Sequence, residues 1–194
     1  EYRKGIILSN NAPTRSVTLR ELAQASVAAG GGPIMATGAM GRARQAPSFG
    51  AHVVDVEVDP DTGKVSIVGY WAFQDCGFAV NPTMVEGQMQ GGVDKGIGWA
   101  LTEEYVFQNG VMRNPTFLDY RMPTSLDLPF IEPVIVQVPN PDGPYGIRGV
   151  GEVPIVSPMA AIANAIAAAT GVRLQERPMS PEAVLWAMKR HGGK

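Results

Sequence analysis

Five glycines lie inside a segment that otherwise carries the signals of one long helix. Asn81 supplies an N-cap, Pro82 suits the first helical position, and the pattern continues to about Glu104. Each glycine in a helix interior costs about 1 kcal/mol relative to alanine. The segment therefore predicts a helix whose backbone is approached closely by another element or by a ligand; a partly looped segment is the alternative. The glycines are Gly87, Gly91, Gly92, Gly96 and Gly98.

The rest of the sequence predicts an α+β fold, with antiparallel strand pairs and packed helices. Residues 52–58 alternate in polarity as a half-buried strand does, residues 59–63 have turn composition, and residues 64–72 continue as the partner strand. The chain has no internal repeat and no clear linker, so a single domain over residues 1–194 is expected. The other predicted elements are a helix over 16–30 with Thr18 and Glu21 in a capping box, a loop over 31–50, a hairpin over 105–113 around Asn109-Gly110, a strand over 132–138, a structured loop over 139–151, and helices over 157–171 and 180–189.

Charge and cysteine content exclude several function classes. The chain has 16 basic and 18 acidic residues, so it offers no basic field that would hold a nucleic-acid backbone. Cys76 is the only cysteine and there are two histidines, which excludes an internal disulfide framework and a zinc or iron–sulfur site built from this chain. We expect Cys76 to be a small buried hydrophobe. No targeting segment is visible, and a cytoplasmic location is expected.

The stretch from Val153 to Val172 carries no charged residue over 20 positions, which is long enough to span a membrane. It is mostly alanine, however, and it contains two prolines and Asn164. Alanine contributes little to membrane insertion, so a buried helix of a larger protein is favoured over a span. Ser157 and Pro158 are expected to cap and begin this helix.

Glu152 is the titratable residue in the most unusual setting. It follows Gly149 and Gly151 and precedes apolar residues and a proline. A carboxylate there is expected to be poorly solvated, which would suit a base near neutral pH. The glycines would let a cofactor or a substrate approach the backbone. The alternative, which spacing alone favours, is a glutamate near a helix N-terminus, stabilised by the helix dipole at about 0.3–1 kcal/mol.

Polar residues on both sides of this segment are weaker candidates. Gln88 and Gln90 lie on the glycine-rich helix, and an amide can donate and accept at once, which suits a heteroaromatic ligand. Two glutamines on a helix are also typical of a solvated face. Arg148 can pair with Glu152 four residues on or with an anionic ligand, and the sequence does not choose between them.

Four stretches, in order along the chain, resemble the large molybdenum-cofactor-binding subunit of the xanthine dehydrogenase/aldehyde oxidase family. They begin at Ser48, Gln74, Gly149 and Arg177, and the second and third read QDCGFAVNPTMVEGQMQGG and GVGEVPIVSP. Subunits of that family are several times longer. The resemblance therefore implies that residues 1–194 are a single incomplete domain, the C-terminal segment of a molybdenum-cofactor-binding domain.

The resemblance also implies an activity. These enzymes are oxidoreductases that hydroxylate an aldehyde, a purine or another N-heterocycle with oxygen from water. By resemblance Glu152 is the base that takes the proton from the molybdenum-bound hydroxide. Gln88, with Gly87 and Gly151, is assigned to the pyranopterin cofactor, either molybdopterin or its cytosine dinucleotide form. No residue of this chain is assigned as a metal ligand.

Partners follow from the same resemblance. Electrons would leave through Fe–S clusters and FAD in partner chains. The expected partners are the remaining part of the molybdenum subunit, an iron–sulfur subunit and a flavin subunit. A non-catalytic assembly or scaffold fragment of such a complex is the alternative, because most of the family's cofactor loops have no counterpart here. The substrate stays open, and so does the choice between a molybdenum–sulfido and a copper-bridged centre.

Overall fold

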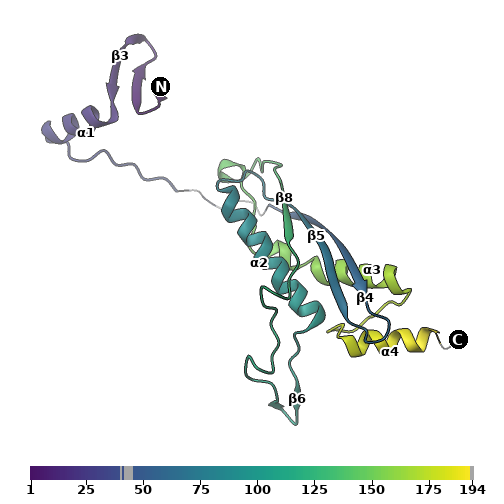
Figure 1. The fold of residues 1–194 in the computed structure, drawn as a ribbon. Helices are drawn as coiled ribbons and strands as arrows, with labels where there is room; N and C mark the ends of the chain where they lie inside the picture. The colour runs from purple at the N-terminus through teal and green to yellow at the C-terminus, as the bar shows by residue number, and fades with distance from the viewer. Residues whose placement is uncertain (40, 42–45, 193–194) are drawn as a thin grey trace. The chain divides into compact units, whose positions relative to one another are not determined.

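The computed structural model describes residues 1–39, 41 and 46–192. It divides the chain into two compact units, Glu1–Arg42 and Ala43–Lys194, where the sequence predicts one domain (Figure 1). The predicted loop over 31–50 is confirmed over 31–39, 41 and 46–48, while residues 40 and 42–45 lie outside the described residues. Those residues hold no helix or strand, whereas the prediction is wrong at residues 49 and 50, which begin the strand Phe49–Val58.

The first unit is a small antiparallel sheet followed by a helix. Strands β1 (Tyr2–Arg3), β2 (Ile6–Ser9) and β3 (Ala12–Thr18) pair in that order, and α1 spans Leu19–Ala28. The predicted capping box of α1 is confirmed, since Glu21 N donates to Thr18 Oγ1 (3.1 Å) and Thr18 N donates to the Glu21 carboxylate (2.9 Å). The sequence does not predict the three strands, which are short and lack the apolar alternation on which strand prediction depends.

The second unit is built on a three-stranded sheet of order β4-β5-β8. Strands β4 (Phe49–Val58) and β5 (Val65–Asp75) are antiparallel, as predicted. Strand β8 (Ile131–Val136) is parallel to β5, which the prediction of antiparallel pairs does not include. The chain reaches β8 through a long connection, and a connection of that length can bring a strand back in the parallel direction.

Helices pack against the sheet and enclose one core. Helix α2 (Pro82–Leu101) contacts β5 and β8, and helix α3 (Pro158–Thr170) contacts β4 and α2 (Figure 1). Helix α4 (Pro181–Gly192) completes the fold. The predicted hairpin is confirmed by β6 (Phe107–Gln108) and β7 (Val111–Met112), with positive φ at both turn residues. The buried core includes Tyr70, Ala72, Met89, Val93, Ile97, Ile162 and Ile166.

The uncharged stretch forms two elements. Its first part is the short 3-10 turn η2 (Val153–Ile155), and its second part is α3. The window Val153–Thr170 is long and apolar enough to cross a membrane by length and composition alone, but Ile162 and Ile166 are fully buried in the core. The predicted cap at Ser157 is wrong: its side chain makes no cap hydrogen bond, because the residue already has helical φ and ψ after η2.

His52 gives the chain a pH-dependent stability. Its Nδ1 lies 2.8 Å from the Tyr70 hydroxyl, and burial lowers the pKa of His52 from 6.5 to about 4. An unfolded His52 binds a proton below about 6.5 and the folded one only below about 4, so stability falls as the pH drops through this window. We expect a loss of roughly 2–3 kcal/mol from this group at pH 4 relative to pH 7.

Urea denaturation of the full chain at pH 7 and at pH 4 measures this effect. His52→Gln has no imidazole to protonate and is expected to show a smaller drop between the two pH values. An equal drop in both proteins would assign the pH dependence to other groups.

Candidate functional site

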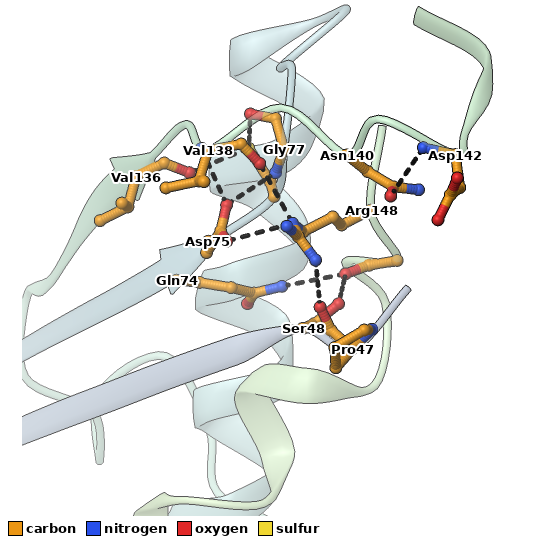
Figure 2. Close-up of polar contacts among 12 residues, drawn as sticks. Pro47, Ser48, Gln74, Asp75, Gly77, Val136, Val138, Asn140, Asp142 and Arg148 are labelled. Carbon is orange, nitrogen blue, oxygen red and sulfur yellow. Dashed lines mark hydrogen bonds and ion pairs between the residues drawn. The ribbon is translucent and has the colours of Figure 1, made fainter. Parts of the chain in front are cut away.

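A buried ion pair fastens the loop before Glu152 to the end of β5 (Figure 2). Arg148 Nε lies 3.1 Å from Asp75 Oδ2, and the two side chains are only 10% and 9% exposed. Arg148 also donates to the carbonyl oxygens of Val138 (3.1 Å) and Pro47 (2.5 Å). Asp75 Oδ1 accepts from the backbone N–H groups of Gly77 (2.9 Å) and Val138 (3.1 Å). Both charges are therefore paired and hydrogen-bonded, as buried charges require.

This ion pair answers the question that the sequence leaves open about Arg148. The arginine pairs with Asp75 and not with Glu152. Spacing of four residues would have favoured Glu152 only on a helix, and the backbone between them is not helical. Asp75 is a site residue that sequence reasoning misses, because its partner lies 73 positions along the chain.

Backbone bonds on both sides of Gly77 hold the loop as well. Arg148 N donates to Cys76 O, and Phe78 N donates to Gly146 O, each at 2.9 Å. Gly77 has φ +66°, and a Cβ there would lie 2.9 Å from Arg148 N, so only glycine fits. Cys76 is buried, as predicted, and burial raises the pKa of its thiol. A protonated buried thiol at this place is structural.

Glu152 directly follows this fixed loop and precedes η2. It is exposed, so the expectation of a poorly solvated carboxylate is wrong for this chain. The physical reason is that Gly149 and Gly151 carry no side chains to cover it. The alternative is a glutamate that stabilises a helix N-terminus. No hydrogen bond supports it, because the Glu152 side chain does not cap η2. The structure thus presents an accessible acid four residues after Arg148, where the ion pair holds the loop.

The predicted cofactor residues are also exposed. Gln88 and Gly87 lie in the first half of α2, and Gly151 lies beside Glu152. A Cβ added at Gly87 or at Gly151 would have no atom within 4 Å, so contacts within the described residues do not require glycine there. These positions leave room for an occupant from outside the chain.

The helical glycines fall into two groups. A Cβ on Gly92 would lie 2.6 Å from the Pro154 ring, one on Gly96 would strike the Pro158 ring, and one on Gly98 would strike Glu103. These three allow the close approach of other elements, as predicted. Gly87 and Gly91 face open space. Since each costs about 1 kcal/mol in a helix, packing against the described residues does not account for them.

Helix α2 and the segment around Glu152 meet at one junction. Helix α2 contacts η2, with Gly92 against Pro154. Gln88 lies four residues before Gly92, on the same side of the helix, and Glu152 lies two residues before Pro154. The structure therefore places Gln88 and Glu152 on adjacent elements. Gln90 is different: its Nε2 donates to Ile131 O (3.1 Å), so its amide ties α2 to β8 and not to a ligand.

A second polar cluster, which no sequence signal marks, lies at the other end of α2. Glu103 is 1% exposed, and the Tyr120 hydroxyl donates to its Oε2 at 2.5 Å. This hydrogen bond raises the pKa of Tyr120, and burial raises the pKa of Asp94. The cluster ties the end of α2 to the segment after the β6–β7 hairpin.

The fold is α+β, and comparison with known proteins gives its class. Residues 1–129 match the family model described as the molybdopterin cofactor-binding domain. The chain belongs to this family, that of the molybdenum-binding subunits of xanthine dehydrogenase and aldehyde oxidoreductase.

Individual relatives show the same likeness. The chain is 42% identical over 154 residues to the putative xanthine dehydrogenase molybdenum-binding subunit of Escherichia coli K12, covering 78% of this chain and 20% of that protein. It is 39% identical over 142 residues to aldehyde oxidoreductase of Megalodesulfovibrio gigas, covering 73% and 15%. The solved Cu,Mo-CO dehydrogenase aligns with a TM-score of 0.87 at 26% identity, covering 99% of this chain and 25% of that one. The chain thus spans about a fifth of the length of the curated relatives it matches.

Proposed function

We propose that this chain is part of a molybdenum hydroxylase, an oxidoreductase that hydroxylates an aldehyde, a purine or another N-heterocycle with oxygen from water. One observation carries the proposal. An accessible carboxylate, Glu152, follows a loop fixed by a buried ion pair and adjoins glycines that packing among residues 1–39, 41 and 46–192 does not explain. Membership of the molybdopterin cofactor-binding family supports it.

The residues present fit the cofactor. The exposed amide of Gln88 can donate to and accept from a pterin, and Gly87 and Gly151 leave the backbone open to close approach. We propose these three residues as the part of the site that this chain contributes. Molybdopterin, or its cytosine dinucleotide form, supplies a Lewis-acidic metal that accepts two electrons when bound.

Glu152 acts as the general base in this proposal. Its carboxylate accepts the proton that the water-derived oxygen gives up as it attacks the substrate carbon. The Asp75–Arg148 pair holds the loop at Arg148, four residues before the acid. The remaining part of the subunit would cover Glu152 and exclude bulk water from it.

The partners are the remaining part of the molybdenum subunit, an iron–sulfur subunit and a flavin subunit, through whose Fe–S clusters and FAD the electrons leave. Names of relatives support a complex: one is the large subunit of nicotine 6-hydroxylase of Paenarthrobacter nicotinovorans, another the large chain of a carbon monoxide dehydrogenase. We propose a cytoplasmic location. A non-catalytic scaffold fragment is the second candidate, favoured by the small share of its relatives, about a fifth, that the chain spans. Native mass spectrometry separates the two, since a stable 20.6 kDa species without a pterin would favour the scaffold.

Filling the open glycine position tests the cofactor site. In the assembled enzyme, Gly87→Leu is expected to lower the pterin content per subunit about tenfold, which corresponds to about 1.4 kcal/mol of binding free energy. The leucine side chain would occupy the space proposed for the cofactor. Leucine is a better helix former than glycine, so the substitution is not expected to weaken α2. Pterin and molybdenum are measured on the purified complex.

The matched control is Glu86→Leu, which adds the same side chain at the neighbouring exposed position. It points about 100° away around the helix and is expected to leave the pterin content within twofold. Equal pterin content in the Gly87→Leu enzyme and the wild type would remove this face of α2 from the cofactor site.

A further inference from the structure

Gln74 is a buried polar residue that the proposed function does not use. It is 1% exposed, at the end of β5 beside Asp75. Its Nε2 donates to Val150 O (3.3 Å) and reaches Gly149 O (3.5 Å). Ser48 Oγ donates to the same Gly149 carbonyl at 2.9 Å. These side-chain bonds hold the last carbonyls before the Gly151-Glu152 turn.

The segment that Gln74 holds has little else to fix it. Glycine has the widest choice of φ and ψ, and a Cβ at Gly149 or Gly151 would contact nothing within 4 Å. Arg148 lies before this segment, and its side chain turns toward Asp75. The backbone between Arg148 and η2 is therefore positioned mainly by hydrogen bonds to its carbonyl groups.

Gln74 is a costly choice for this place if stability alone matters. Its Oε1 is buried and has no hydrogen-bond partner within the part of the chain that the structure describes. A buried polar atom without a partner destabilises a fold, whereas an apolar side chain of similar size would not carry that cost. A residue that breaks a packing rule in this way is more easily explained by function.

We propose that Gln74 is a positioning residue for Glu152: by holding the carbonyls of Gly149 and Val150, it sets where the chain turns into η2 and where the carboxylate stands. This inference rests on the proposed role of Glu152 as the base. Gln74 does not touch the reacting atoms in this account. It acts through the backbone of the loop.

The test uses the assembled enzyme and two readouts. Gln74→Met keeps the length of the side chain and removes both donations. Hydrogen–deuterium exchange of a peptide over residues 145–150 is expected to become about tenfold faster, because the Arg148 N–H, which donates to Cys76 O, lies directly before the carbonyls that the substitution releases. Turnover is expected to fall about tenfold or more with KM little changed and molybdenum retained, since a misplaced catalytic group loses rate more than binding.

Two further variants keep the test decisive. Gln90→Met removes an amide that bonds to Ile131 in the core, and it is expected to change neither readout by more than twofold. Ser48→Ala removes a bond to the same Gly149 carbonyl from near the surface, and it is expected to act in the same direction as Gln74→Met, more weakly. If Gln74→Met does not fold, Ser48→Ala decides the question.

The outcomes separate this inference from the proposed function. If Glu152→Gln abolishes turnover while Gln74→Met and Ser48→Ala leave exchange and turnover unchanged, Gln74 does not position the base and the inference is overturned. If Glu152→Gln stays fully active, the proposed function fails, and the inference falls with it even when loop exchange has risen. Faster exchange together with slower turnover in Gln74→Met is the result that supports it.

Discussion

Replacing Glu152 with glutamine is expected to lower the turnover of the assembled enzyme by about 10²-fold or more, while its molybdenum and pterin contents stay at the wild-type level. Glutamine has nearly the same shape as glutamate and cannot take up a proton at neutral pH. Glu152 is exposed and makes no cap hydrogen bond, so the substitution is not expected to disturb the fold of this chain. Steady-state turnover and metal analysis of the same preparation measure both quantities.

Glu182→Gln is the matched control, because Glu182 is an exposed acid at the start of α4, as Glu152 is an exposed acid directly before η2. It is expected to leave turnover within twofold. A fully active Glu152→Gln enzyme would reject Glu152 as the base. Loss of molybdenum together with activity would point to a role in cofactor retention.

Replacing Asp75 with asparagine is expected to lower the free energy of unfolding of the chain by about 3–5 kcal/mol. The substitution keeps the shape of the side chain but leaves the Arg148 guanidinium, only 10% exposed, without its carboxylate. The asparagine amide would also bring N–H donors toward a group that only donates. Chemical denaturation of the full chain at pH 7 measures the change.

Two comparisons show whether the ion pair is the cause. Asp55→Asn removes an exposed carboxylate from β4 and is expected to change stability by less than about 0.5 kcal/mol. Adding Arg148→Met to Asp75→Asn is expected to recover part of the loss, because the uncompensated charge is gone. If Asp75→Asn costs no more than Asp55→Asn, the pair does not stabilise the loop.

Local signals in the sequence predict most of the helices and hairpins. The Thr18–Glu21 capping box, the Asn109-Gly110 turn and the Asn81 cap each depend on residues within a few positions of one another, and all three are confirmed. Helix α2 ends at Leu101, three residues before the predicted end, because Thr102 N and Glu103 N both donate to Gly98 O. Such an ending depends on how the next segment packs.

Long-range pairings are what the sequence does not predict. The direction of β8 beside β5 and the partner of Arg148 join segments more than 50 residues apart. The exposure of Glu152 is of the same kind, since it depends on which side chains come near in space and not on its neighbours in the chain.

The glycines of α2 show both what the sequence predicts and what depends on the tertiary structure. The sequence by itself determined that a helix with so many glycines must let something come close to its backbone, because glycine is costly in a helix and has no side chain. Only the tertiary structure decided which glycine serves which neighbour: Gly92 and Gly96 receive proline rings from η2 and α3, whereas Gly87 and Gly91 face open space. The physical reason is that close packing depends on both surfaces in a contact, and the sequence does not state which segments of the chain meet.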